Sequence, residues 1–246
     1  MFMMHPGYSD PIYMVVMLIG AGLSFLPQLW VEGTYKQYAK VPAASGMTGL
    51  QVAQRILAQE GIRDVAVEMT PGRLSDHYDP SIKVIRLSPD NYHGNSIAGI
   101  TISAHEVGHA IQHAVGYYPV VMRSQLAPLF GLGSQLGPLL FFAALFLGYT
   151  SAAIPQWSIY LAVAGVALFS LSVVFHIVTL PVEINASRRA MAILSNGGML
   201  QQSELPAAKK ILTAAAFTYV AVALHSLIQL AYYVFRLMGL TQRSRD

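Results

Sequence analysis

Cysteine is absent from this chain of 246 residues, and charged residues are scarce, at 11%. Without cysteine there is no disulfide framework, and thiolate chemistry is excluded. The basic residues are scattered along the sequence, so the net charge of +3 does not indicate a nucleic-acid-binding protein. Apolar residues dominate instead, at 54% of the sequence.

Asp, Glu, Lys and Arg are missing from three long stretches, residues 11–31, 124–182 and 211–235. A membrane-spanning helix needs about 20 apolar residues, so the outer stretches hold one span each. The middle stretch of 59 residues holds two, interrupted near residues 148–151 and Pro155. A soluble helix bundle cannot explain 59 residues without a charged face. The spans that we predict are approximately residues 12–29, 127–148, 157–180 and 212–235.

The distribution of Lys and Arg predicts the topology. They are absent from residues 1–10 and from the loop at 149–156, whereas residues 31–125 carry eight and residues 181–210 carry four. The positive-inside rule then places the N-terminus outside and both charged regions in the cytoplasm. The sequence before the first span lacks the basic start of a signal peptide, so we expect a retained anchor.

The C-terminal arginines conflict with this topology. Arg236, Arg243 and Arg245 would lie on the outer side, which the rule disfavours. Either the last apolar segment crosses as a tolerated exception, or it does not cross fully.

The region between the first two spans is predicted to be soluble. Residues 45–60 have apolar positions at helical spacing, with Ser45 or Thr48 as the cap and Gly61 at the end. Residues 65–69 and 81–88 are strand-like, and residues 76–80 are typical of a turn. We therefore expect a small sheet packed on a following helix. Its edge could hold an extended peptide, although residues 82–87 could equally serve only as core.

The following helix carries the most specific motif of the chain. Residues 105–109 read His-Glu-Val-Gly-His. On a helix, His105 and His109 share one face, where two neutral imidazoles can bind one tetrahedral Zn²⁺. Glu106 projects beside that face and could serve as general base toward a zinc-bound water, whose pKa is about 7. The competing interpretation is a buried helix whose histidines make ordinary hydrogen bonds.

A catalytic zinc has three protein ligands, so one must come from elsewhere in the chain. Residues 91–203 contain only two acidic residues, Glu106 and Glu183. A carboxylate next to a span is costly unless it is paired or ligating, and two spans return Glu183 to the side of the motif. We predict His105, His109 and Glu183 as the ligands. Glu183 could instead face the positive end of a helix dipole beside an arginine.

Other histidines fit the third position less well. His113 lies eight residues after His105, about 12 Å along a straight helix, which is too far to share the ion. Metzincin spacing would require Gly at position 112 and His at 115, where this chain has Gln112 and Val115. His176 could support the site or be buried in a span.

Four blocks of sequence together resemble the YugP-like neutral zinc metallopeptidases of bacterial membranes. They are residues 75–80 (Ser-Asp-His-Tyr-Asp-Pro), 86–88 (Arg-Leu-Ser), 104–112 and 181–190. The resemblance covers nearly the whole chain. It implies an integral-membrane zinc endopeptidase with His105 and His109 as zinc ligands and Glu106 as the catalytic acid and base.

The last block is also similar to that of the HtpX-type membrane proteases, which are gluzincins. There the glutamate ligand is followed four residues later by aspartate, whereas Ser187 stands at that position here. Asn185 or Ser187 could supply the missing hydrogen bond. We predict that His176, Asn185, Ser187 and Arg188 support the metal site or contact the substrate.

The sequence thus predicts a mainly α integral membrane protein with about four transmembrane helices. A small α+β zincin-like soluble region contains the HExxH helix. We expect five parts: an anchor (1–30), the soluble region (31–125), a transmembrane hairpin (126–181), a helix with the third ligand (182–210) and a last transmembrane helix with its tail (211–246).

The predicted function is that of a zinc metalloendopeptidase acting on membrane or membrane-proximal proteins. We place it in the bacterial inner membrane, with the active site on the cytoplasmic side. A protein or peptide substrate and the lipid bilayer are the expected partners, and nucleic acid is not. A zinc-binding scaffold or chaperone subunit is the main alternative. A transporter is disfavoured because no span carries Asp, Glu, Lys or Arg.

Overall fold

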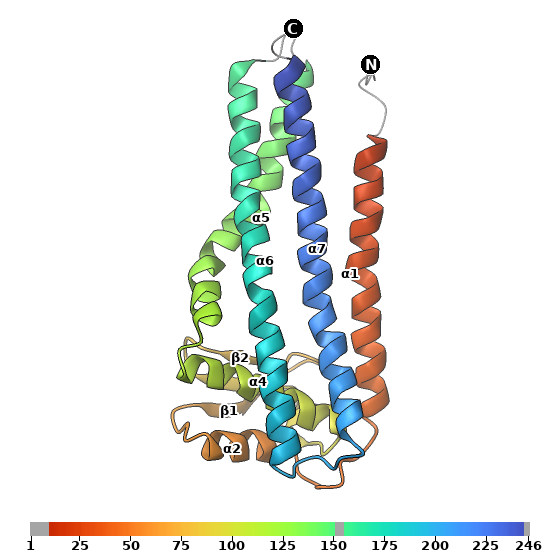
Figure 1. Ribbon diagram of the computed structural model, residues 1–246, viewed down its shortest axis with the longest axis vertical. Helices are drawn as coiled ribbons and strands as arrows, with labels where there is room; N and C mark the ends of the chain where they lie inside the picture. The colour runs from red at the N-terminus through yellow and green to blue at the C-terminus, as the bar shows by residue number, and fades with distance from the viewer. Residues whose placement is uncertain (1–9, 151–154, 244–246) are drawn as a thin grey trace. The chain divides into compact units, whose positions relative to one another are not determined.

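Long helices dominate the computed structural model, which describes residues 10–150 and 155–243. Over these residues, four helices are long and apolar enough to cross a membrane. They are α1 (Pro11–Tyr38), α5 (Tyr118–Thr150), α6 (Gln156–Asn196) and α7 (Leu205–Arg243) (Figure 1). The predicted fold class, a mainly α multi-pass membrane protein with a small soluble region, is confirmed. Ser151, in the expected interruption, and Arg245 lie outside the described residues.

The helices extend beyond the predicted spans. We expected a separate helix over residues 182–210, but α6 continues without a break from Gln156 to Asn196, and α7 begins at Leu205. Pro181 lies inside α6 and removes only one backbone donor, which a long helix can tolerate. After the proline, buried apolar residues recur every four positions, which favours continuation of the helix. They are Val182, Ala186, Ala190 and Leu194.

Residue contacts divide the chain into two compact units. The first, called here the helical unit, comprises the chain up to Leu26, Met122–Val178 and the chain from Val220 onward. The second, called here the sheet unit, comprises Pro27–Val121 and Thr179–Tyr219.

Glycines allow close packing of α5 on α6 within the helical unit. A Cβ on Gly137 would lie 2.8 Å from the backbone nitrogen of Phe169, and one on Gly165 would lie 2.7 Å from that of Phe141. Both distances are too short for any other residue, so the two backbones approach in the way that small residues permit in membrane proteins. Phe141 then stacks on Tyr233 of α7, with ring centroids 4.3 Å apart.

An ion pair joins the beginning of α1 to α7 within the same unit. Arg236 Nη1 lies 3.2 Å from Asp10 Oδ2, and the Tyr232 hydroxyl donates to the same oxygen at 2.7 Å. The carboxylate neutralises one of the three arginines that conflict with the predicted topology.

The sheet unit combines a three-stranded sheet with short helices (Figure 1). Its elements are α2 (Gly49–Gln59), β1 (Ala66–Met69), β2 (His77–Asp79), β3 (Val84–Leu87), α3 (Pro89–His93) and α4 (Ile97–Ala114). Thr48 caps α2 through a reciprocal capping box with Gln51. Of the two caps that the sequence offered, Ser45 and Thr48, the structure uses Thr48. Ile85 and Leu87 of β3 are fully buried with Val107 of α4 in one core.

One expectation about the sheet was wrong, and one open alternative is decided. The residues expected to form a turn, 76–80, contain strand β2, and the turn follows at 80–83. A strand of three residues is too short to show alternation, and Pro80 made the segment resemble a turn. In addition, β3 is the central strand of the order β1–β3–β2, parallel to β1 and antiparallel to β2. Residues 84–87 are therefore core and not an exposed edge.

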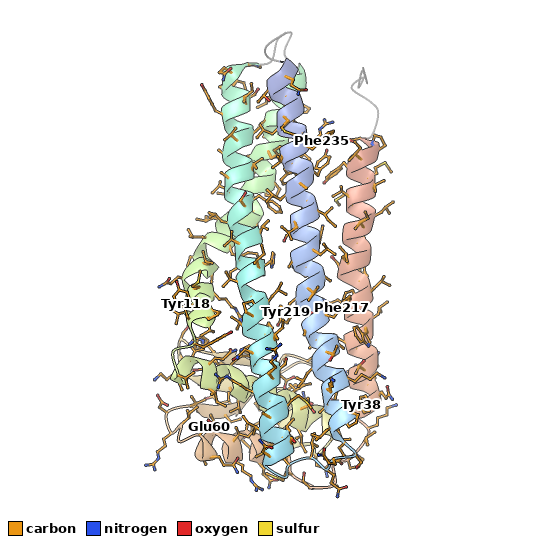
Figure 2. The ribbon with its side chains drawn as sticks, viewed as in Figure 1. Tyr38, Glu60, Tyr118, Phe217, Tyr219 and Phe235 are labelled. Carbon is orange, nitrogen blue, oxygen red and sulfur yellow. The ribbon has the colours of Figure 1, made fainter. Side chains whose placement is uncertain are left out.

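The parts of α1 and α7 that belong to the sheet unit carry aromatic side chains. Trp30 of α1 contacts Phe217 of α7, with ring centroids 5.5 Å apart, and Phe217 and Tyr219 can be followed on α7 in Figure 2. Tyr118, at the beginning of α5, is 70% exposed (Figure 2). Aromatic side chains of this kind are typical of membrane–water interfaces.

Candidate metal centre

Three donor residues meet within the sheet unit. His105 and His109 come from α4, and Glu183 comes from α6. The Nε2 atoms of His105 and His109 lie 3.4 and 3.5 Å from Glu183 Oε2. The ligand atoms of these three residues all lie within 4.8 Å of one another. Among the described residues, they form the group of potential ligands that could hold a metal ion.

The separations fit a tetrahedral zinc ion. Two ligands that each lie about 2.0–2.1 Å from one tetrahedral Zn²⁺ are roughly 3.3 Å apart. The observed 3.4 and 3.5 Å agree with this value and exceed the 2.7–3.2 Å of ordinary N–H···O hydrogen bonds. Imidazole nitrogen and carboxylate oxygen are also donors that zinc prefers. The interpretation as ordinary hydrogen bonds therefore explains this geometry less well.

Gly108 determines how closely α6 can approach the motif helix. A Cβ on this glycine would lie 2.8 Å from the carbonyl oxygen of Ala186, which is closer than packing permits. Ala186 follows Glu183 by three residues, which is close to one helical turn, and both residues are buried. The glycine of the HExxH motif thus brings the α6 backbone, and with it Glu183, against the two histidines.

Glu106 is 8% exposed beside the donor residues. Burial raises the pKa of Glu106 above its usual range, and His105 and His109 partly oppose this shift. A carboxyl group with a raised pKa accepts a proton more readily than an ordinary surface carboxylate. Glu106 is therefore suited to proton transfer at the donor cluster.

His109 has a perturbed pKa as well. Burial favours the neutral ring, but the adjacent negative carboxylate of Glu183 outweighs burial and raises the pKa of His109. Zinc binds the neutral imidazole, so a zinc ion at this residue would compete with protons.

The remaining ring nitrogens of both histidines have partners. Ser187 Oγ lies 3.3 Å from His105 Nδ1, and Gln112 Oε1 lies 3.1 Å from His109 Nδ1. Hydrogen bonds to Nδ1 orient a ligating histidine so that Nε2 faces the metal. Asn185 Oδ1 in turn accepts from Gln112 at 3.0 Å. Asn185 and Ser187 thus lie beside the cluster, where the sequence placed them.

Gln112 and Arg189 were missed by the sequence analysis. Arg189 Nε donates to Asn185 Oδ1 at 2.8 Å, and Gln112 is fully buried. The spacing could have identified Gln112, because it lies three residues after His109, where helical side chains are neighbours. Nothing in the sequence distinguishes Arg189 from Arg188.

Two residues that the sequence predicted beside the site, His176 and Arg188, and the rejected candidate His113 are not among the three donor residues. His176 belongs to the helical unit, where its ring packs against Phe130 with centroids 5.2 Å apart. Arg188 is exposed, and over the described part of the chain no contact joins it to the three donor residues. His113 packs against Tyr78 of β2 at 5.5 Å.

A second polar network holds α3 to the loop before β2. Asp76 accepts from the Ser88 backbone at 2.7 Å and from Asn91 Nδ2 at 2.9 Å. Asn91 Oδ1 accepts from the hydroxyl of Tyr35 at 3.1 Å. Burial raises the pKa of Asp76, against these hydrogen bonds, which lower it. Residues of two of the four resemblance blocks therefore have a structural role beside α4.

Comparison with known proteins agrees with this site. Residues 13–238 match the family described as "Putative neutral zinc metallopeptidase". The chain belongs to this family. It is also 42% identical over 223 residues to the "Putative membrane protease YugP" of Bacillus subtilis (strain 168), an alignment that covers 91% of this chain and 95% of the relative. No solved structure matches the chain.

Family membership confirms the resemblance inferred from the four sequence blocks. It also confirms zinc as the cofactor, and His105, His109 and Glu183 could hold it. The individual roles of these three residues, and of Glu106, stay predictions.

Proposed function

We propose that the chain is a membrane-embedded zinc metalloendopeptidase that hydrolyses peptide bonds in membrane or membrane-proximal proteins. The observation that supports this most is the meeting of three donor residues, in which Glu183 lies at the spacing of zinc ligands from both His105 and His109. The buried Glu106 lies on the same helix as the two histidines. Bound zinc would lower the pKa of a water molecule and polarise the substrate carbonyl. A purely structural zinc site would have no use for Glu106.

In this proposal Glu106 moves the proton. Its carboxylate accepts a proton from the attacking water as the water oxygen bonds to the carbonyl carbon of the substrate. It then gives that proton to the nitrogen of the leaving amine as the C–N bond breaks. The raised pKa of Glu106 suits both halves of this transfer.

The substrate would bind in an extended conformation. Strand β2 lies at an edge of the sheet and contacts α4 through Tyr78 and His113. An edge strand can bind an extended segment by backbone hydrogen bonds. We place the sheet unit on the cytoplasmic side of a bacterial inner membrane, since the positive-inside rule favours that side for residues 31–125 and 181–210.

Cleavage of an unfolded protein such as casein by the purified, zinc-loaded chain tests the proposal. Glu106→Gln should retain zinc and lose on the order of 10²- to 10⁴-fold in rate, because it removes the proton acceptor. Glu183→Ala should lose zinc. A chelator should abolish cleavage, and added zinc should restore it.

Two outcomes would contradict parts of the proposal. Full zinc content and activity in Glu183→Ala would show that the third ligand is another residue. A wild-type chain that binds zinc, cuts no casein and traps no protein in its Glu106→Gln form would support the scaffold alternative.

A further inference from the structure

The side chain of Gln112 connects the motif helix to α6. It is fully buried, and its Nε2 donates to the carbonyl oxygen of Val182 at 2.8 Å and to Asn185 Oδ1 at 3.0 Å. Its Oε1 faces His109 Nδ1 at 3.1 Å. One amide thus contacts a histidine of the motif and the residue that directly precedes Glu183.

The chemistry of the neighbours permits one orientation of this amide. The backbone carbonyl of Val182 can only accept, so the NH₂ group of Gln112 must face it. Arg189 can only donate, so the atom of Asn185 that faces Arg189 Nε at 2.8 Å must be the oxygen. That oxygen also requires a donor from Gln112. Two independent contacts therefore turn the Gln112 NH₂ group toward α6.

The orientation of the amide determines the proton position on His109. With its NH₂ group facing α6, Gln112 presents only a carbonyl oxygen to His109, and a carbonyl oxygen must accept. In the neutral ring, which is the form that binds zinc, the hydrogen must then be on His109 Nδ1, and the Nε2 lone pair is directed toward Glu183. A ligating histidine requires this tautomer if it binds through Nε2.

We propose that Gln112 is a positioning residue that fixes the Nδ1–H tautomer of His109, and that Arg189, acting through Asn185, holds Gln112 in the required orientation. This inference rests on the proposed role of His109 as a zinc ligand. It assigns a function to Arg189, a residue that contacts none of the three donors in the described part of the structure.

His105 lacks such a device. Its Nδ1 faces the hydroxyl of Ser187 at 3.3 Å, and a hydroxyl can either donate or accept. Ser187 therefore does not determine the tautomer of His105. The two motif histidines differ in this respect, so loss of Gln112 should affect zinc binding more than loss of Ser187.

The test uses the full-length chain in detergent, with zinc affinity measured by competition with a chromophoric chelator. Gln112→Met keeps the length of the side chain and removes the amide, and it should weaken zinc binding by about 10- to 100-fold. Arg189→Met should weaken it by a smaller factor, and Arg189→Lys, which keeps a donor there, should restore it. Arg188→Met is the matched control, because it removes the same charge from the exposed neighbour, and its zinc affinity should equal that of the wild type.

A second readout observes the proton itself. In the zinc-loaded chain with ¹⁵N-labelled histidine, His109 should show a protonated Nδ1 whose hydrogen exchanges slowly with water. The signal should exchange faster in Arg189→Met and remain slow in Arg188→Met. This measurement on the wild type does not depend on whether Gln112→Met folds.

The results that would contradict the positioning role of Gln112 differ from those that would contradict the proposed peptidase function. An unprotonated Nδ1 on His109, or unchanged zinc affinity in both Gln112→Met and Arg189→Met, would overturn the positioning role. If instead His109→Ala leaves zinc affinity unchanged, the ligand assignment itself fails. A chain that binds zinc through a protonated, protected His109 but cleaves nothing would retain the positioning role and refute the peptidase.

Discussion

Gly108 of α4 lies directly against the backbone of Ala186 in α6, so close that a Cβ on the glycine would be 2.8 Å from the Ala186 carbonyl oxygen. The distance between the HExxH helix and the helix of Glu183 is therefore limited by the absence of one side chain. This contact makes the glycine of the motif a determinant of metal geometry, although it carries no donor atom.

Gly108→Ala should therefore separate Glu183 from the two histidines. A backbone carbonyl cannot yield as a flexible side chain can, so one helix must shift. A displacement near 1 Å costs on the order of 100-fold in activity, and zinc affinity should fall with it. Gly33→Ala in α1 is the matched control, since nothing lies within 4 Å of a Cβ there. Equal zinc affinity in the two variants would contradict this role of Gly108.

Ser187 offers a test of the hydrogen bond to His105. Ser187→Ala removes the hydroxyl that lies 3.3 Å from Nδ1 and should weaken zinc binding, by less than Gln112→Met does. Ser187→Asp introduces a carboxylate that can accept from Nδ1–H more strongly than a hydroxyl, and should bind zinc at least as tightly as the wild type. Chelator competition measures both. Weaker binding in Ser187→Asp than in Ser187→Ala would contradict the prediction.

The pH dependence of stability should reveal the buried carboxyl of Asp76. Burial raises its pKa in the folded chain, so protonation favours folding. The resulting stabilisation is fully present below the unfolded pKa, about 3.9, and is lost as pH rises through the raised folded pKa. The stability advantage of the wild type over Asp76→Asn should therefore shrink as pH increases from acid to neutral.

Asp79 provides a control for the same experiment, because its pKa is shifted in the opposite direction to that of Asp76. A backbone hydrogen bond from Ser81 lowers the pKa of Asp79, so its stabilisation is present above the unfolded pKa and is lost as pH falls through the lowered folded pKa. Thermal unfolding followed by tryptophan fluorescence from acid to neutral pH compares Asp76→Asn with Asp79→Asn. Parallel pH profiles for the two variants would refute the assignment for Asp76.

The ion pair between Asp10 and Arg236 should stabilise the helical unit. Both side chains are largely buried, at 13% and 14% exposure, so removal of one partner leaves a charge in poorly hydrated surroundings. Asp10→Asn and Arg236→Met should each lower the thermal midpoint, and the double variant should lower it by less than the sum. Additive effects, measured in the same detergent, would show that the two charges do not interact.

Local sequence patterns were sufficient for the long helices and for half of the predicted site. Uncharged length identified the four long helices, because a span must bury every backbone polar group within a helix of about 20 apolar residues. Helical spacing placed His105, Glu106 and His109 together, since residues four apart share a face whatever the tertiary structure is. The shortness of β2 hid it, because three residues carry no periodic pattern.

The composition of the chain was sufficient to select Glu183 as a candidate ligand far from the motif in sequence. Glu183 could be selected because acidic residues are rare near the spans, and the even number of intervening spans returned it to the side of the motif. The sequence pattern did not predict how closely Glu183 approaches the two histidines. That approach depends on the contact between Gly108 and Ala186, which lie about 80 residues apart in the chain.

By itself the sequence determined a membrane protein with a zinc-binding HExxH helix and a carboxylate available as third ligand, because apolar length and helical periodicity are local properties. Only the tertiary structure decided that α6 continues through Pro181, that the Nε2 atoms of His105 and His109 lie 3.4 and 3.5 Å from Glu183 Oε2, and that Gln112 lies against His109. These depend on the direction of individual hydrogen bonds between packed helices, which periodicity does not encode.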